Sequence, residues 1–258
     1  SYLGRLTLQD WLGLPVGIVV LGIVLMALFM FWGGEHLERI FGGKDLKREP
    51  KVRYADAGAL ALAAVIVVLI GQPTTSDKWQ ALEPDKAPLL AERAVQIHPG
   101  ELLDALHSDA LKVILLDIRN EADYNIFHIA GARRVTLAEL SDLIPSLLLE
   151  PANTIFVTVS NDETAATEAW KLLTAESVPN AYILERGING WLDTFASADP
   201  ALRKSTPVAG DDRLRYESAM ALGARSPAAT PEVDEFQVEY TPKIQLEFKK
   251  GPSGGGCG

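Results

Sequence analysis

The chain contains, at residues 115–135, the segment LLDIRNEADYNIFHIAGARRV, from which its fold class can be worked out. The segment starts inside VILLDI (Val113–Ile118), an apolar run typical of a strand that is buried on both faces. TIFVTVS (Thr154–Ser160) and the shorter Tyr182–Leu184 follow the same pattern. Helical patterns separate these strands at Gly100–His107, Leu137–Leu148, Thr164–Ala175 and Asn189–Phe195. Strands that alternate with helices predict an α/β domain over residues 96–197, with a parallel sheet flanked by helices.

The composition excludes several other classes of protein. One cysteine in 258 residues rules out an internal disulfide, a CxxC redox pair and a zinc site built from several cysteines. The chain has 24 basic and 34 acidic residues, so its net charge of −10 argues against a nucleic-acid partner.

Two motifs in this region resemble the rhodanese homology domain. In that family a strand ends in Asp-x-Arg, and an acidic-aromatic stretch then leads to Gly-His-Ile-x-Gly-Ala. The matching residues are Asp117, Arg119, Glu121, Tyr124, His128, Ile129, Gly131 and Ala132, while Phe127 replaces the usual glycine. Downstream, ILERGINGW (Ile183–Trp191) is similar to the closing Leu-x-Gly-Gly-x-x-x-Trp motif, although Arg186 stands in place of its first glycine. The resemblance covers about 100 of the 258 residues.

We expect structural roles for these motif residues. Asp117 and Arg119 are predicted to pair at the end of their strand, and His128 has no neighbouring residues that suggest a metal site. Gly187 is expected to serve a backbone conformation that a side chain would obstruct, and Trp191 to lie in the core. No metal or cofactor is expected.

The resemblance also locates the loop where active relatives carry a catalytic cysteine, directly after the central strand. Here that loop reads Ser160, Asn161, Asp162, Glu163 and Thr164, which places Ser160 at the cysteine position; a shift of one residue would place Val159 there instead. Neither residue can hold a persulfide, because a thiolate is the required nucleophile. Asp162 and Glu163 either repel an anionic donor or cap the following helix. We therefore expect no catalytic residue in this degenerate loop and lean against enzymatic activity.

The single thiol, Cys257, belongs to the glycine-rich ending GPSGGGCG. It is a speculative functional residue: a persulfide carrier, an intermolecular disulfide partner, a lipid attachment point or an exposed thiol without a defined role.

The N-terminal part is predicted to anchor the chain in a lipid bilayer. After an arm at residues 1–10, the run from Trp11 to Gly34 carries no charge and is long enough to cross about 30 Å of hydrocarbon. A charged loop at 35–54 leads to a second apolar segment at 55–72, which is either a second transmembrane helix or a buried core helix. Residues 73–95 are expected to form a linker to the rhodanese-like domain.

The basic residues suggest an orientation for these two helices. Six lie in the charged loop, namely Arg39, Lys44, Lys47, Arg48, Lys51 and Arg53, against Arg5 alone before the first span. The positive-inside rule then places the loop in the cytoplasm. We expect a multi-pass protein of a bacterial-type inner or equivalent membrane, with its soluble domain on the outer, periplasmic or luminal, face.

Residues 198–258 form a C-terminal extension that is predicted to be partly extended or disordered. A helix is expected at residues 211–223, with Asp211 as its N-cap. Apolar residues then recur with period two in EFQVEYTPKIQLEFKK, which favours an extended arm over residues 235–249 that contacts a partner.

Together these features lead to one main hypothesis about function. The protein is a membrane-anchored, catalytically inactive rhodanese-like domain that acts as a docking or structural accessory subunit of an integral membrane complex. The alternative is a membrane-tethered sulfurtransferase or sulfur relay that uses Cys257 as a persulfide carrier. A ligand sensor that uses the altered loop is a third reading.

Overall fold

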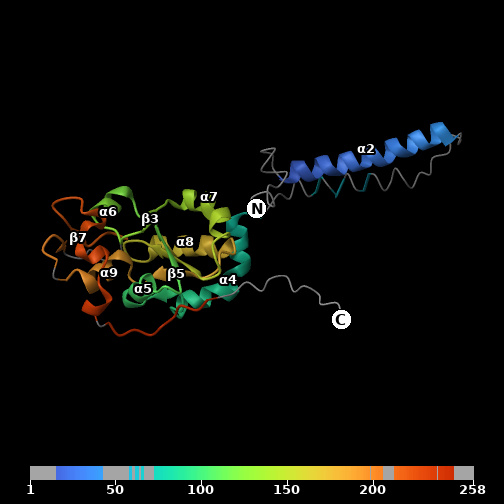
Figure 1. Cartoon of the computed structure of the whole chain (residues 1–258). Coiled ribbons are helices and arrows are strands. Elements are labelled where there is room, and N and C mark those ends of the chain that lie inside the picture. Colours follow the sequence, from blue (N-terminus) through green and yellow to red (C-terminus); the bar gives the residue numbers. More distant parts are fainter. Residues whose placement is uncertain are drawn as a thin grey trace, which may run out of the picture. The chain divides into compact units, whose positions relative to one another are not determined.

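The computed structural model describes residues 16–42, 58–59, 62–63, 65–66, 73–197, 199–205, 212–236 and 238–246. The chain divides into two compact units, Ser1–Pro73 and Thr74–Gly258. The second unit holds the sheet and the candidate site (Figure 1).

A five-stranded parallel sheet lies at the centre of the second unit, in the strand order β1-β5-β4-β2-β3. Its strands are β1 (Gln96–Ile97), β2 (Lys112–Asp117), β3 (Arg133–Arg134), β4 (Thr154–Val159) and β5 (Ala181–Leu184). Every residue of the central strand β4 is buried. Strands β2 and β4 pair along their whole length and end together at Asp117 and Val159, so the loops that follow them meet. The predicted α/β class and parallel sheet are confirmed.

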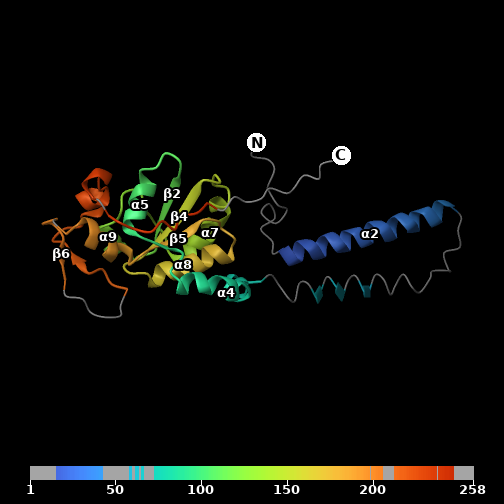
Figure 2. The ribbon, with the colours of Figure 1, turned by 90° about the horizontal axis from the view of Figure 1, so that it is seen from below.

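Helices cover both faces of this sheet. Helices α5 (Pro99–Leu106) and α9 (Gly187–Phe195) pack on one face, where Trp191 is fully buried. Helices α7 (Leu137–Leu147) and α8 (Thr164–Ala175) pack on the other. Figure 2 shows α5 and α8 on opposite sides of the strands. The short helix α6 (Glu121–Ile126) follows β2 and belongs to the site.

Residues 73–95, which the sequence suggested as a linker, contain a further helix, α4 (Thr75–Ala91). Thr74 and Asp77 form a capping box at its start. Helix α4 packs on α8, where the edge of Trp79 meets the ring of Trp170 at a centroid distance of 5.9 Å. Two prolines inside α4 conceal it in the sequence, because proline normally interrupts a helix.

The predicted membrane anchor is not supported. In the first unit, α2 (Val16–Gly42) extends past the end of the predicted span at 11–34 and continues through the charged sequence EHLER, while residues 11–15 lie outside the described residues. Among the described residues, no helix has the length and apolar content needed to cross a membrane. This finding overturns the predicted multi-pass localisation. The N-terminal arm at 1–10, most of the loop at 35–54 and most of the second segment at 55–72 lie outside the described residues.

The described part of the C-terminal extension belongs to the second unit and packs on its core, and it does not form the helix predicted at 211–223. Strand β6 (Arg203–Lys204) pairs antiparallel with β7 (Tyr216–Glu217), and this hairpin uses the backbone that the helix would need. Three short 3-10 helices follow: η1 (Gly223–Arg225), η2 (Pro227–Ala229) and η3 (Val233–Glu235). The indole N–H of Trp191 donates to the carbonyl oxygen of Ala228 at 2.7 Å, which joins the extension to the core. In Figure 1 the orange and red extension lies beside α9.

The described part of the arm, residues 235–236 and 238–246, packs on the chain's own domain. The backbone N–H groups of Lys243 and Ile244 both donate to Glu101 Oε1 of α5 at 2.6 Å. The hydroxyl of Tyr240 bonds to Asp104, and the hydroxyl of Tyr182 donates to the carbonyl oxygen of Gln245 at 2.8 Å. The apolar side chains of Phe236, Val238, Ile244 and Leu246 pack against the hydrophobic core of the same chain, and contact of the arm with a separate partner stays a prediction. Residues 247–258, including Cys257, lie outside the described residues.

Candidate functional site

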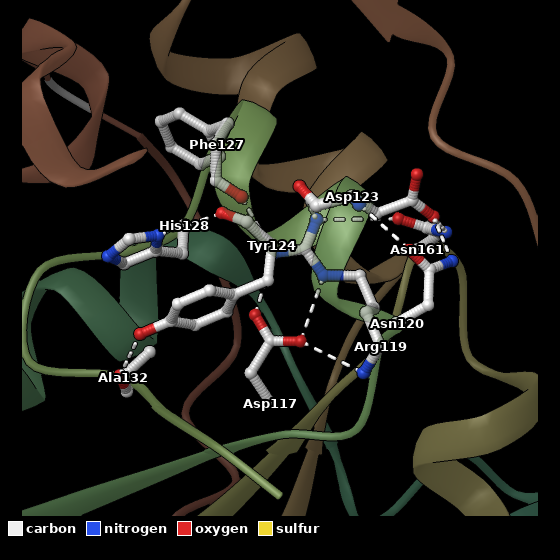
Figure 3. Close-up of polar contacts among 9 residues, drawn as sticks. All are labelled: Asp117, Arg119, Asn120, Asp123, Tyr124, Phe127, His128, Ala132 and Asn161. Carbon is white, nitrogen blue, oxygen red and sulfur yellow. Dashed lines mark hydrogen bonds and ion pairs between the residues drawn. The ribbon is translucent and has the colours of Figure 1, made fainter. Parts of the chain in front are cut away.

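A buried ion pair fixes the loop that follows β2. Arg119 Nη2 lies 2.6 Å from Asp117 Oδ2, and Arg119 Nε donates to Asp117 Oδ1 at 2.9 Å. The two side chains are 1% and 0% exposed. Arg119 also donates to the carbonyl oxygen of Phe127 at 2.8 Å and to Asn161 Oδ1 at 3.4 Å (Figure 3). The predicted pairing is confirmed, and the guanidinium ties α6 to the loop after β4.

The aromatic residues of the first motif hold the next turn. Tyr124 and His128 stack with ring centroids 3.8 Å apart (Figure 3). The hydroxyl of Tyr124 donates to the carbonyl oxygen of Ala132 at 2.7 Å, and His128 Nδ1 lies 2.9 Å from the carbonyl oxygen of Tyr124. These contacts give His128 a structural role, as the sequence suggested.

The loop after β4 begins with two fully enclosed residues. Ser160 is 0% exposed, and its hydroxyl has no hydrogen-bond partner within the described part of the chain. Asn161 is 2% exposed; its Nδ2 donates to Asp123 Oδ2 at 2.6 Å, as Figure 3 shows. The first position of the loop is therefore closed to solvent.

The second motif, at the start of α9, forms hydrogen bonds with the same loop. The N–H groups of Ile188 and Asn189 donate to the carbonyl oxygens of Ser160 and Asn161 at 2.9 and 3.0 Å. Gly187, with φ of +56°, allows this approach, because a Cβ there would lie 2.3 Å from the carbonyl oxygen of Ser160. Glycine is therefore required at position 187, both because φ is positive and because a side chain would clash with the backbone of the loop.

A carboxylate from the C-terminal extension occupies the loop. Asp212 Oδ1 accepts from the N–H of Asp162 at 2.8 Å, and Asp212 Oδ2 accepts from the N–H of Ala165 at 3.3 Å. Asn161 Nδ2 also donates to the carbonyl oxygen of Asp212 at 3.1 Å. Because the N-terminus of α8 attracts negative charge, an anion is well placed here.

The loop's own carboxylates are engaged as well. Asp162 Oδ1 accepts from the N–H groups of Glu163 and Thr164, in the second case at 2.7 Å. Glu163 is the N-cap residue of α8, but its side chain makes no capping hydrogen bond. Glu163 pairs with Arg93, whose Nη2 lies 2.7 Å from Glu163 Oε1, and it also accepts from the N–H of Arg186 at 2.7 Å.

The two aspartates have opposite pKa shifts. Burial raises the pKa of Asp212, and the nearby Asp162 carboxylate raises it further against the hydrogen bonds that Asp212 accepts. Burial acts on Asp162 in the same direction, but the hydrogen bonds from Thr164 and Glu163 outweigh it and leave the pKa of Asp162 below its usual value. Asp212 therefore holds a proton to higher pH than Asp162 does.

The residues around this loop present charged side chains and hydrogen-bonding groups. A cavity of about 250 Å³ opens beside it and is lined by Asp162, Glu163, Thr164, Arg186, Asn189 and Arg215. Across the described ranges, no group of three or more His, Cys, Asp or Glu residues is arranged to hold a metal ion.

A family model described as "Rhodanese-like domain" matches residues 98–194. Residues 98–194 form a rhodanese-like domain. The family assignment made from the two motifs is confirmed, and the matched residues include neither β1 nor any of the C-terminal extension.

Solved structures of rhodanese-like proteins are similar to this domain. The Rhodanese-like domain of an Anabaena sp. protein is 22% identical and covers 45% of this chain and 92% of its own, with a TM-score of 0.33. A rhodanese-related protein from Thermoplasma volcanium is 16% identical and covers 38% and 90%, with a TM-score of 0.31. A full-length protein from Lactobacillus plantarum is 23% identical and covers 43% and 92%, with a TM-score of 0.35. None of the curated proteins compared with the chain gives a match.

The rhodanese-like domain brings all five predicted loop residues, Ser160–Thr164, to the end of β4 beside the first motif. Sequence reasoning missed Asp212, Asn189 and Arg93. Asp212 was assigned to a helix, and the signal that could have found Asn189 is its position two residues after Gly187, at the start of α9. Arg93 fell within the supposed linker.

Proposed function

We propose that this protein is a docking or structural accessory subunit whose rhodanese-like domain lacks sulfurtransferase activity. The observation that carries this proposal is the state of the loop after β4. The residue that opens it is a fully buried serine, and the amides of Asp162 in the loop and of Ala165 in the first turn of α8 already donate to Asp212. A sulfurtransferase needs a thiolate at this place and free amides to stabilise it.

The direct test is a sulfur-transfer assay on the purified full chain with thiosulfate and cyanide. We expect no thiocyanate above the rate without protein. Turnover that disappears in a Cys257→Ser variant would overturn the proposal and establish the sulfur relay. Intact mass spectrometry adds a second reading, because a persulfide on Cys257 adds the mass of one sulfur atom.

The accessory role is tested by the state of the protein when it is purified gently from its source. We expect it to migrate with a defined set of other subunits in stoichiometric amounts. Migration as a lone monomer, at concentrations near those in the cell, would contradict the accessory role.

A further inference from the structure

The loop after β4 and Asn189 of α9 together bind residues Asp212–Arg215. At one end, the carboxylate of Asp212 accepts from the N–H groups of Asp162 and Ala165. At the other end, Asn189 Nδ2 donates to the carbonyl oxygen of Arg213 at 2.8 Å, and Asn189 Oδ1 accepts from the N–H of Arg215 at 2.7 Å.

These contacts recognise only a few features of the bound segment. They use one carboxylate, the backbone carbonyl oxygens of Asp212 and Arg213, and the backbone N–H of Arg215. An asparagine that bonds both a carbonyl oxygen and an N–H of another segment reads extended backbone independently of its side chains.

We propose that the loop Ser160–Ala165 and Asn189 form a recognition site for an extended segment led by an acidic residue. Residues 212–215 of this chain occupy the site in cis, and a partner protein supplies the same chemistry in trans. This inference rests on the proposed docking function and specifies the kind of partner.

Two features of the site are consistent with exchange between cis and trans ligands. The recognising groups belong to the rhodanese-like domain, whereas the occupant belongs to the extension that follows it. The carboxylate of Asp212 also lies close to that of Asp162, and the repulsion between the two negative charges weakens the binding of residues 212–215 to the site. A tethered segment competes at an effective concentration on the order of millimolar, so a trans ligand binds well only once the cis segment is released.

The first experiment measures cis occupancy by amide hydrogen exchange in the full chain. An Asp212→Ala variant should exchange the N–H groups of Asp162 and Ala165 at least about ten times faster than the wild type, because both lose their acceptor. Asp234→Ala removes an exposed carboxylate from the same extension and should leave both rates unchanged. Equal rates in Asp212→Ala and wild type would overturn the proposal.

The second experiment measures binding in trans. A variant with Asp212→Ala and Arg215→Pro lacks the cis carboxylate and the N–H that reaches Asn189, but keeps Leu214 and Tyr216, which pack on the core. A fluorescent acetylated peptide, Asp-Arg-Leu-Arg, should bind this variant at least about ten times more tightly than the wild type. Replacing the Asp of the peptide by Asn, or adding Asn189→Ala to the protein, should each weaken binding several-fold.

Failure of this peptide to bind the opened variant, with circular dichroism showing an intact fold, would overturn the inference, as would equal binding of the Asn peptide. Neither result bears on sulfur transfer. A positive sulfur-transfer assay would instead contradict the proposed function without affecting the peptide-binding results. The two experiments therefore show which of the two proposals has failed.

Discussion

Gly187 lies so close to Asp162 that a Cβ on the glycine would stand 2.1 Å from the carbonyl oxygen of the aspartate. This approach lets the N-terminus of α9 bind the loop after β4. The positions of α9 and of the loop therefore depend on each other.

Gly187→Ala should destabilise the protein by about 3 kcal/mol or more, because left-handed backbone costs an alanine about 1–2 kcal/mol and the contact with backbone adds to it. Urea unfolding measures the loss. Gly131→Ala is the matched control, since Gly131 also has a positive φ, of +79°, but faces open space, so it should lose only about 1–2 kcal/mol. Equal losses at both positions would show that the contact has no effect.

Arg119→Met should cost about 3–5 kcal/mol, because it leaves the fully buried carboxylate of Asp117 without a cation. Lys171→Met breaks the exposed pair with Glu168 and should cost less than about 1 kcal/mol. Adding Asp117→Leu to Arg119→Met should recover part of the loss. A smaller cost for Arg119→Met than for the lysine variant would contradict the ion-pair interpretation.

Ser160→Cys should not create a sulfurtransferase. The new sulfur would replace an atom of a fully buried residue, and the amides of Asp162 and Ala165 would still donate to Asp212. Made in a Cys257→Ser background, the variant should react with iodoacetamide only after denaturation and should release no thiocyanate. Rapid labelling of the native protein would show that the loop opens more readily than its contacts imply.

Raising the pH above 10 should weaken the attachment of the arm to α5. Burial, followed by the carboxylates of Asp104 and Glu101, raises the pKa of Tyr240 from 10.0 to about 12. A raised pKa favours the neutral phenol in the folded state, so its stabilising effect is complete below pH 10 and is lost as the pH rises through about 12.

Ultraviolet titration of tyrosinate, with Tyr240→Phe as the reference, measures this ionisation. Asp104→Ala should lower the midpoint of the Tyr240 transition, because it removes the side-chain acceptor. An unchanged midpoint would mean that Asp104 contributes nothing to the attachment.

The layout of the sheet could be predicted because its long elements have strong patterns. The bounds predicted for α8, Thr164–Ala175, agree with the structure. The two paired strands β2 and β4 were each recognisable as an apolar run. The buried pair of Asp117 and Arg119 also followed from the motif, since charged residues at the end of a buried strand need partners close by.

The occupant of the loop could not be predicted, because its contacts join residues about fifty positions apart. Asp212 and Asp162 carry no periodic signal that links them. Helix α4 was hidden by Pro84 and Pro88, because proline is the poorest helix former, and the contact of Trp79 with Trp170 that packs α4 on α8 leaves no local signal in the sequence. The period-two pattern predicted an extended arm, but nothing in that pattern showed that Glu101 of the same chain would accept N–H groups of the arm.

The bond from Trp191 to Ala228 has a practical consequence for protein production. The family match ends at residue 194, so a fragment trimmed to those bounds would leave the indole N–H of a fully buried tryptophan without its acceptor. It would also remove the arm that packs on α5 and expose apolar surface that favours aggregation. Expression and crystallisation trials should therefore start from residues 74–246, treating the extension as an integral part of the folding unit.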